Sequence, residues 1–293
     1  MKQLSYHSRF ILVLLFTLLN TLPICSQAAT PRYRIAACDW MMLKRQKLGE
    51  FKLAHELGAD GVEVDMGGLG KRVLFDNQLR EPQQAEKFQA AARQYGVAVP
   101  SMAMSGFFAQ SFLTRDNYQD LLKDCFQTMK LFGSKVAFLP LGGSGKDWQQ
   151  EGQQMVSRLR TAGEMAKQES ITIGIRTGMG AKFDKKLLKK VGSSQIKVYY
   201  NFQDAADHHR DICKELRKLG AQRIVQIHVS NTDSVNLQED PEINLPKIRK
   251  TLDKMKWSGW LVVERSRDVK RVRDVKYNFG RNIAYLKQVF QER

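Results

Sequence analysis

Cysteine, histidine and long hydrophobic runs are all scarce in this sequence. Its 293 residues include 4 cysteines and 5 histidines. Cys38, Cys125 and Cys213 lie far apart, and their spacing fits neither a disulfide framework nor a zinc-ligand motif. We expect these three cysteines to be small buried apolar side chains, Cys38 in a strand and the other two in helices.

Motifs for binding phosphate or nucleic acid are also missing. The residues after the first apolar run, AACDWMML, contain no glycine-rich turn, which argues against a doubly wound dinucleotide-binding sheet. The formal net charge is +17, but the basic runs Lys185–Lys190, Lys214–Lys218 and Lys270–Lys276 lie in or near predicted helices. Solvated helix faces explain them better than an anion-binding patch, and we expect no nucleic-acid partner.

The N-terminus has a composition of its own. Lys2 and Arg9 precede the apolar run Phe10–Leu19, and Ser26 and Ala28 supply small residues before a cleavage point. We interpret residues 1–28 as a secretory signal peptide and residues 29–293 as one domain, secreted and located in the periplasm. The apolar run is too short to span a membrane, and no later segment reaches that length.

The rest of the chain alternates eight times between a short apolar run and a longer amphipathic stretch. The predicted strands are Tyr33–Asp39, Gly61–Asp65, Val97–Met102, Lys135–Pro140, Ile171–Arg176, Ile196–Phe202, Arg223–Val229 and Trp260–Glu264. The predicted helices include Pro82–Tyr95, Tyr118–Phe132, Trp148–Gln168, Ala206–Leu219 and Leu245–Met255. Runs that stay apolar without alternation are typical of parallel strands covered on both faces. Eight such units in about 260 residues predict an α/β fold, a single (β/α)8 TIM barrel.

Polar residues stand at the carboxyl ends of four predicted strands. Arg176 follows ITIGI, Asn201 follows IKVYY, His228 follows IVQI and Glu264 follows WLVV. The carboxyl ends of barrel strands converge on one mouth, where TIM barrels carry their chemistry. Because a buried charge needs a partner or a role, we interpret these residues as a functional site.

Further candidates follow the first three predicted strands. Trp40 follows the first, and of the two carboxylates of the second we expect only one to face the mouth, Asp65 rather than Glu63. Met104 and Phe107 follow the third strand. Aromatic residues beside polar groups suit a sugar ring, which has apolar faces and a hydroxyl edge. Phe107 could equally fill the top of the barrel.

With these residues in view, the chain resembles the sugar phosphate isomerase/epimerase family, the xylose isomerase-like TIM barrels. The resemblance rests on GADGVEVD, GVAVPSMAMS, IHVSNTD and WSGWLVVERS. It implies that strands five to eight end in Glu, Asp, His and Glu, which hold a divalent metal while the two Glu move protons beside a carbonyl. His228 and Glu264 match the last two positions. Asn201 stands in place of the Asp, Arg176 in place of the first Glu, and Asp204 in place of a His or Asn of the following turn.

The altered positions change what the resemblance implies about cofactors. A guanidinium stays protonated and has no acceptor, so Arg176 cannot ligate a metal. We expect no cofactor, with Arg176 occupying the place of the metal and pairing with Glu264. If Arg176 swings away, His228, Glu264 and Asn201 could hold Mn, Zn, Co or Mg, because Asn201 would still offer an oxygen.

Two functions remain in competition. The first is a secreted sugar isomerase/epimerase-like enzyme in which Glu264 is the base, His228 the acid or orienting group, and Arg176 stabilises an enolate oxygen. The expected substrate-binding residues are Trp40, Asp65, Met104, Phe107, Asn201, Asp204 and Arg265. The second is a non-catalytic carbohydrate-binding barrel that has lost the metal site. Both imply a small-molecule carbohydrate as the partner and leave a homo-oligomer open, whereas 5 histidines are too few for a three-metal endonuclease.

Overall fold

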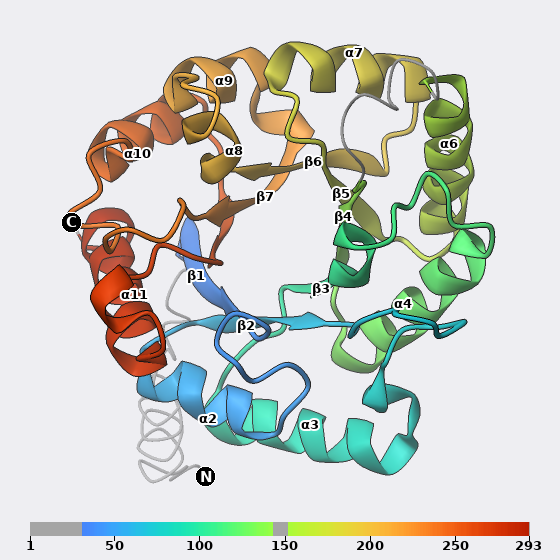
Figure 1. Cartoon of the computed structure of the whole chain (residues 1–293), viewed down its shortest axis with the longest axis horizontal. Coiled ribbons are helices and arrows are strands. Elements are labelled where there is room, and N and C mark those ends of the chain that lie inside the picture. Colours follow the sequence, from blue (N-terminus) through green and yellow to red (C-terminus); the bar gives the residue numbers. More distant parts are fainter. Residues whose placement is uncertain (1–30, 143–151, 293) are drawn as a thin grey trace, which may run out of the picture. The chain divides into compact units, whose positions relative to one another are not determined.

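Eight parallel strands close into a barrel in the order in which they occur along the chain (Figure 1). They are β1 (Tyr33–Cys38), β2 (Gly61–Asp65), β3 (Ser101–Ala103), β4 (Val136–Pro140), β5 (Thr172–Arg176), β6 (Ile196–Asn201), β7 (Ile224–Val229) and β8 (Gly259–Val263). The computed structural model describes residues 31–142 and 152–292, so the expected signal peptide lies outside the described residues. All eight predicted strands are present, and the predicted TIM barrel is confirmed.

The strand β3 is shorter and begins later than the predicted Val97–Met102. Its residues pair with β2 and β4, whereas before it Ala98 forms only an isolated bridge to Gly61. Pro100 lies directly before β3 and has no backbone N–H to donate. Regular pairing therefore starts after the proline.

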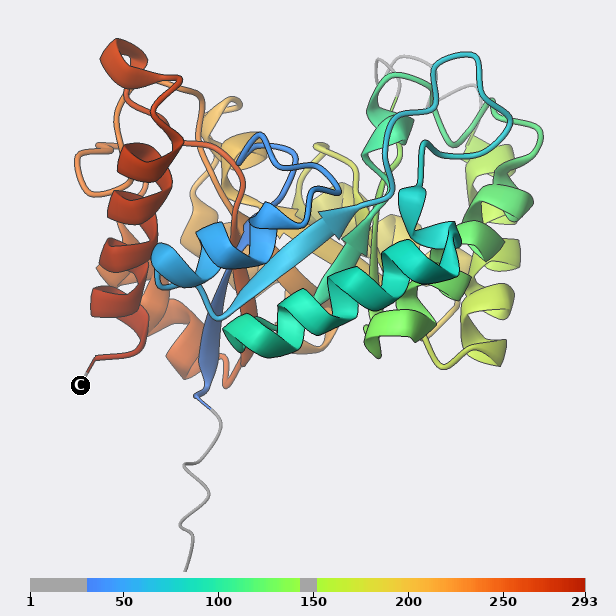
Figure 2. The ribbon, with the colours of Figure 1, turned by 90° about the horizontal axis from the view of Figure 1, so that it is seen from below.

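Helices follow the strands and surround the barrel. They are α2 (Gly49–Glu56), α3 (Pro82–Tyr95), α4 (Tyr118–Phe132), α6 (Gly152–Gln168), α7 (Ala181–Val191), α8 (Phe202–Ala206), α9 (Ile212–Leu219), α10 (Leu245–Lys254) and α11 (Val275–Phe290). Short 3₁₀ turns occur at η1 (Gln78–Arg80), η2 (Ser105–Phe108), η3 (Ala221–Arg223) and η4 (Val269–Arg271). The helices α3 and α4 have the predicted bounds; the predicted start of α6, Trp148, lies outside the described residues. Figure 2 shows the loops after the strands rising at one end, while β1 begins at the other.

The predicted helix Ala206–Leu219 begins later in the structure. Ala206 is the last residue of α8, and α9 covers only Ile212–Leu219. Asp211 caps α9, since its side chain accepts a hydrogen bond from the backbone N–H of Lys214. Capping satisfies an N–H that has no partner at a helix start. Asp211, which lies inside the predicted helix, therefore marks the start of α9.

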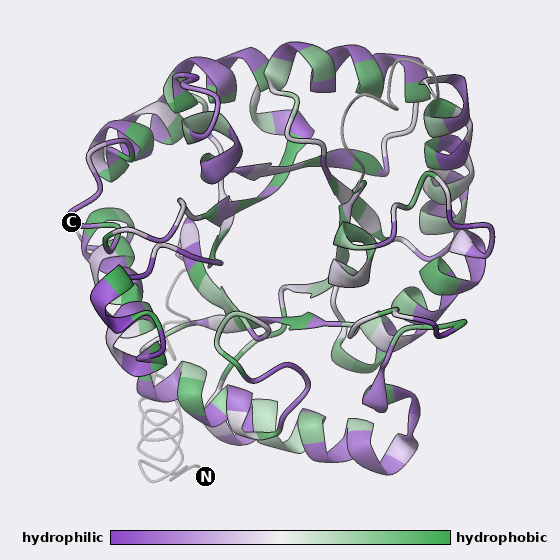
Figure 3. Cartoon of the chain, viewed as in Figure 1, coloured by the Kyte–Doolittle hydropathy of each residue, from purple (hydrophilic) through white to green (hydrophobic). Residues whose placement is uncertain are grey.

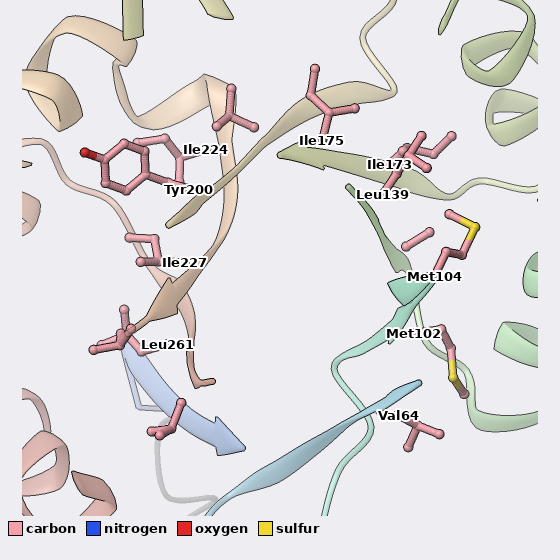
Figure 4. Packing of buried hydrophobic residues seen from close by; sticks show 14 of the residues in the cluster. Val64, Met102, Met104, Leu139, Ile173, Ile175, Tyr200, Ile224, Ile227 and Leu261 are labelled. Atoms are coloured by element: carbon pink, nitrogen blue, oxygen red, sulfur yellow. The ribbon is translucent and has the colours of Figure 1, made fainter. Parts of the chain in front are cut away.

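Buried apolar side chains form one layer outside the sheet and a smaller one inside the barrel. The outer layer fills the space between strands and helices, and Figure 4 shows Met104, Ile175 and Ile227 pointing away from the barrel interior. The helices place hydrophobic residues toward the sheet and hydrophilic residues outside (Figure 3). The inner layer consists of Ala36, Cys38, Ala103, Phe138, Tyr199 and Val262.

Two glycines make room for large side chains inside the barrel. A Cβ atom at Gly174 of β5 would lie 2.9 Å from Cδ2 of Tyr199, and one at Gly61 of β2 would lie 2.8 Å from Cζ3 of Trp260. Side chains do not approach this closely in a packed interior. Tyr199 therefore fills the middle of the barrel and Trp260 its amino-terminal end, which leaves the carboxyl ends of the strands to polar groups.

The cysteines of the described residues behave as expected. Cys38 of β1, Cys125 of α4 and Cys213 of α9 are free and buried. Burial raises the pKa of the Cys38 and Cys125 thiols well above the usual value, so both stay protonated and unreactive. Among the described residues, no helix is long and apolar enough to cross a membrane.

Candidate active site

Arg176, the last residue of β5, is held between two carboxylates at the mouth of the barrel. Its Nε and Nη2 donate to Asp204 of α8 at 2.9 and 2.7 Å, the paired geometry in which guanidinium and carboxylate bind most strongly. Its Nη1 lies 3.4 Å from Oε2 of Glu264, so the expected pairing with Glu264 is present. Burial opposes the charge, but Glu264 and Asp204 outweigh it and raise the pKa of Arg176. The guanidinium therefore stays protonated.

Glu264, which directly follows β8, has four polar neighbours. Its Oε2 accepts hydrogen bonds from Asn201 Nδ2 at 2.9 Å and from Ser230 Oγ at 3.3 Å, and His228 Nδ1 lies 3.9 Å from it. Burial alone would raise the pKa of Glu264, but His228, Arg176, Asn201 and Ser230 together hold it below its usual value. The carboxyl group is therefore ionised at neutral pH.

His228 of β7 is fully buried and is oriented by Glu63 from the other side of the barrel. Its Nε2 lies 2.7 Å from Oε1 of Glu63, while Oε2 of Glu63 accepts from Ser101 Oγ at 2.6 Å and from Tyr199 OH at 2.7 Å. Because a carboxylate in this setting can only accept, the proton of the imidazole belongs on Nε2. Nδ1 is buried without a hydrogen-bond partner among the described residues. It lies on the side of the ring that faces Glu264.

The expectation that only one of Glu63 and Asp65 faces inward is wrong. Residues two apart on a strand share a face, and this spacing in GVEVD was the signal that the sequence analysis missed. Glu63 reaches His228, whereas the buried Asp65 is bound by Arg45 Nε at 2.7 Å and Ser105 Oγ at 2.8 Å. Glu63 therefore belongs to the cluster, and Asp65 ties together the loops beside it.

Two aromatic side chains border the cluster. Trp40 is half-buried, with its ring edge-on to His228 at a centroid distance of 6.2 Å. Phe108 is 46% exposed, and the Arg176 guanidinium carbon lies 5.5 Å from the centre of its ring. Both rings are placed to contact a ligand that reaches Arg176.

Met104 and Phe107, expected to bind substrate, lie in the hydrophobic core instead. Met104 is fully buried in the outer layer (Figure 4). Phe107 is fully buried and packs edge-on against Phe75 and Phe112, with ring centroids 5.5 and 5.6 Å away. The 3₁₀ turn η2 directs neighbouring side chains to different sides, so Phe107 fills the core while Phe108 is exposed.

Arg265 follows Glu264 but belongs to a different ion-pair cluster. Its Nη2 lies 2.8 Å from Oδ2 of Asp233, which also pairs with Arg267 at 2.6 Å. Burial would raise the pKa of Asp233, but the hydrogen bonds from Arg267 and Arg265 lower it to about 2. Adjacent residues of an extended chain point in opposite directions, so Arg265 does not join the cluster of Glu264.

The groups at the mouth do not fit a divalent metal. Among the residues that the structure describes, no three His, Cys, Asp or Glu side chains are placed to hold one. Oδ1 of Asn201 already accepts from Gln203 N at 2.8 Å and lies 3.1 Å from Ser230 Oγ, so it faces donors of the protein itself. Arg176 puts a positive charge 3.4 Å from Glu264, where it would repel a cation bound to that carboxylate. The alternative set of His228, Glu264 and Asn201 is not assembled as a ligand site.

The fold is similar to those of several solved structures. D-psicose 3-epimerase in the presence of D-fructose has a TM-score of 0.70 and 11% identity, covering 88% of this chain and 99% of that chain. 3-keto-D-glucoside 4-epimerase from E. coli has a TM-score of 0.69 and 13% identity, covering 87% and 99%. An AP endonuclease of family 2 from Brucella melitensis has a TM-score of 0.68 and 16% identity, covering 88% and 99%. At these identities the likeness is one of fold.

The sequence itself matches a family model over most of its length. No curated protein matches the chain. The family model described as "Xylose isomerase-like TIM barrel" matches residues 51–289, a span that includes β2 to β8 and nearly all of α11. The resemblance drawn from the sequence is confirmed: the chain belongs to the xylose isomerase-like TIM barrel family.

Proposed function

We propose that this protein is an enzyme of carbohydrate chemistry that removes a proton from a carbon beside a carbonyl group, without a metal. The observation that carries the proposal is the cluster at the mouth, where an ionised carboxylate, an oriented imidazole and a guanidinium lie together. These are the three groups that such a reaction needs: a base, a group that moves a proton between substrate oxygens, and a stabiliser of the developing oxyanion.

Glu264 is the base in this proposal. Its Oε2 is occupied by Asn201 and Ser230, whereas among the described residues Oε1 contacts only Arg176 Nη1, at 3.5 Å. Oε1 is therefore the atom with room to take a proton from carbon. The low pKa makes Glu264 a weak base but keeps it in the reactive, ionised form at neutral pH.

Arg176 is the group that stabilises the enolate oxygen. Its bonds to Asp204, at 2.7 and 2.9 Å, are shorter than its contacts with Glu264, at 3.4 and 3.5 Å. Asp204 thus fixes the position of the guanidinium. Nη1 is the group that can exchange its contact with Glu264 for one with a substrate oxygen. Such a charge would do for the carbonyl what a metal does elsewhere, namely draw electron density onto the oxygen.

The reaction is balanced by the return of a proton. The proton moves from carbon to Glu264 Oε1, and the electron pair becomes an enolate at Arg176. Nδ1 of His228, whose ring is held by Glu63 through Nε2, takes the proton of the hydroxyl group beside the carbonyl and passes it to the former carbonyl oxygen. In an isomerisation, Glu264 then returns its proton to the former carbonyl carbon. In an elimination, the β-substituent instead leaves with the electron pair of its bond to carbon and takes up the proton from Glu264.

Two observations support a substrate class: the similar structures, and the aromatic rings of Trp40 and Phe108 beside the cluster. Two of those structures are epimerases, of D-psicose and of 3-keto-D-glucoside, and we extend the class, a keto sugar, to this chain. Trp40 and Phe108 offer apolar faces that suit such a ring. With the expected signal peptide, we also propose that the protein acts outside the cytoplasm, in the periplasm.

A second candidate is a carbohydrate-binding barrel without turnover. The observation in its favour is that Arg176 and Glu264 already neutralise each other. If a substrate cannot separate them, the mouth can bind a sugar through Trp40 and Phe108 but cannot ionise it.

Hydrogen exchange distinguishes the two candidates. The purified protein is incubated with a panel of keto sugars in D₂O, and the signals of the hydrogens beside the carbonyl are followed by proton NMR. We expect loss of one such signal, and a decrease in its rate by a factor of about 10² or more in Glu264→Gln, because general base catalysis contributes about that much.

Matched variants separate the chemistry from the fold. Glu86→Gln removes an exposed carboxylate of α3 and should leave the exchange rate unchanged. Glu63→Gln should lower the rate by losing the orientation of His228, while a sugar still binds. Binding of a sugar without any hydrogen exchange would favour the carbohydrate-binding barrel and contradict the proposed enzyme.

A further inference from the structure

A hollow of about 750 Å³ lies at the amino-terminal end of the barrel, opposite the mouth. Its walls come from the starts of β1, β4, β7 and β8, from the segments before β3 and β4, and from the carboxyl-terminal halves of α3 and α4. Its size is in the range of sites for small molecules. The proposed function makes no use of it.

The hollow is lined by three cations and by no carboxylate. The cations are Arg34, Arg93 and Lys135, and none of them forms an ion pair within the described residues. Asp60, whose charge acts on Arg34, is itself paired with Lys287 at 2.9 Å. Three positive charges without an ion-pair partner among the described residues, placed around one concave surface, attract an anion.

Arg34 is held in a fixed position. Its guanidinium carbon lies 3.9 Å from the centre of the Trp260 ring, and the indole in turn packs closely against Gly61. Stacking on an indole orients a guanidinium without using its N–H groups, which remain available as donors. A preorganised donor loses little conformational freedom when a ligand binds.

Two residues that line the hollow each carry a buried polar atom that lacks a partner among the described residues. These atoms are Oε1 of Gln226 and Oγ of Ser134, in side chains whose residues are 2% and 5% exposed. Nε2 of Gln226 donates to the carbonyl oxygen of Pro100 at 3.3 Å, which fixes the orientation of the amide. Oε1 is therefore an acceptor that awaits a donor such as a hydroxyl group.

We propose that this hollow is a second binding site, which takes a small carboxylate that also carries hydroxyl groups, namely a sugar acid. The carboxylate pairs with Arg34, Lys135 and Arg93 add attraction from nearby, and a hydroxyl group donates to Oε1 of Gln226. This site is separate from the cluster at the mouth and does not depend on the proposed function.

Calorimetric titration of the purified protein tests the ligand class. D-Gluconate and D-glucuronate are compared with glucose, which has hydroxyl groups but no charge, and with acetate and inorganic phosphate, which have charge but no sugar hydroxyl groups. We expect both sugar acids to bind at least about tenfold more tightly than the other three. Equal binding of acetate or phosphate would overturn the assignment of a sugar acid, and the absence of binding at millimolar concentrations would overturn the site.

Variants test the place of binding. Arg34→Met and Gln226→Met should each weaken gluconate binding about tenfold or more, since each removes a direct partner. Lys135→Gln, at an exposed position that cannot disturb the core, should weaken it less. Arg217→Met, which removes an exposed guanidinium of α9 far from the hollow, and Glu264→Gln at the mouth should both leave it unchanged. If Glu264→Gln abolishes binding while Arg34→Met and Lys135→Gln do not, the acid binds at the mouth and the proposal is wrong.

Discussion

The two ends of this barrel treat positive charge in opposite ways. At the mouth, Arg176 is shared between Asp204 and Glu264. At the amino-terminal end, Arg34 lies on Trp260 in a hollow whose lining contains no acid. A cation that is paired inside the protein supports its partners, whereas an unpaired one is available to a ligand. We therefore expect Arg34, which forms no ion pair within the described residues, to bind external anions more readily than Arg176.

Reversing the charge of Arg176 at the mouth should have the largest effect on stability. Without metal, Arg176→Glu should lower the free energy of unfolding by more than about 3 kcal/mol, because it replaces the cation between Asp204 and Glu264 with a third acid. Added Mn²⁺ or Zn²⁺ should restore much of this loss, and the dialysed variant should retain about one ion per chain. Thermal unfolding and elemental mass spectrometry measure both effects.

The wild type is the control for this variant. We expect it to retain no stoichiometric metal after dialysis and to gain no thermal stability from added Mn²⁺ or Zn²⁺. A wild type that keeps about one ion per chain would mean that Arg176 does not stand in the place of a metal, and a metal-assisted isomerisation would then replace our proposal.

The two ends of the barrel can be compared directly by removing one guanidinium at each end. Arg176→Met should cost about 3 kcal/mol of unfolding free energy, since it leaves the largely buried Asp204 and Glu264 facing each other without a cation. Arg93→Met removes an exposed, unpaired charge and should change the value by no more than about 0.5 kcal/mol. Urea denaturation measures both. Equal effects would show that the ion pairs of Arg176 are not what distinguishes the mouth.

A buried acid beside the mouth, Asp184, should make the stability depend on pH, because it shares a pocket with Arg176 and Asp204. Burial raises the pKa of Asp184 in the first turn of α7 to about 7, with Glu215 and Asp204 adding to it and Thr177 and Arg210 opposing it. Between the ordinary pKa of an aspartate and about 7, the folded state keeps a proton that the unfolded state has released. Stability therefore falls as the pH rises through this window.

The variant Asp184→Asn isolates this effect. We expect it to be more stable than the wild type at pH 8, by an amount on the order of 2–4 kcal/mol, and similar to it at pH 4. Asp120→Asn alters an exposed acid in the first turn of α4 and should leave the slope unchanged. Urea denaturation across the pH range measures the slopes, and an unchanged slope in Asp184→Asn would contradict the assignment.

The sequence was sufficient for the barrel because its signals are local. Eight unbroken apolar runs predict eight buried strands, and proline and glycine at the ends of Pro82–Tyr95 predict that helix to the residue. The predicted helix Ala206–Leu219 began too early, since it included the turn at residues 207–211. Only the capping interaction of Asp211 marks the new start.

The site was predicted only in part. The position of a residue at a strand end can be predicted from the neighbouring sequence, whereas its hydrogen-bond partners on other strands cannot. Arg176, Asn201, His228 and Glu264 were found from their positions at strand ends, and they meet as barrel geometry requires. The contact of Glu63 with His228 joins residues 165 positions apart, and no sequence pattern connects them. The local geometry of η2 decided which of two adjacent phenylalanines was exposed, and spacing alone could not settle this.

That pair of phenylalanines also supplies the smallest expected effect. The ring of Phe108 lies 5.5 Å from the Arg176 guanidinium carbon and is half exposed, whereas the Arg34 carbon lies 3.9 Å from the centre of the Trp260 ring. Phe108→Leu should therefore cost no more than about 0.5 kcal/mol of unfolding free energy. Phe107→Leu, at the buried neighbour, should cost about 1–2 kcal/mol through lost packing. If urea denaturation finds a larger loss for Phe108→Leu than for Phe107→Leu, Phe108 supports the fold, and its place as an aromatic border of the mouth is wrong.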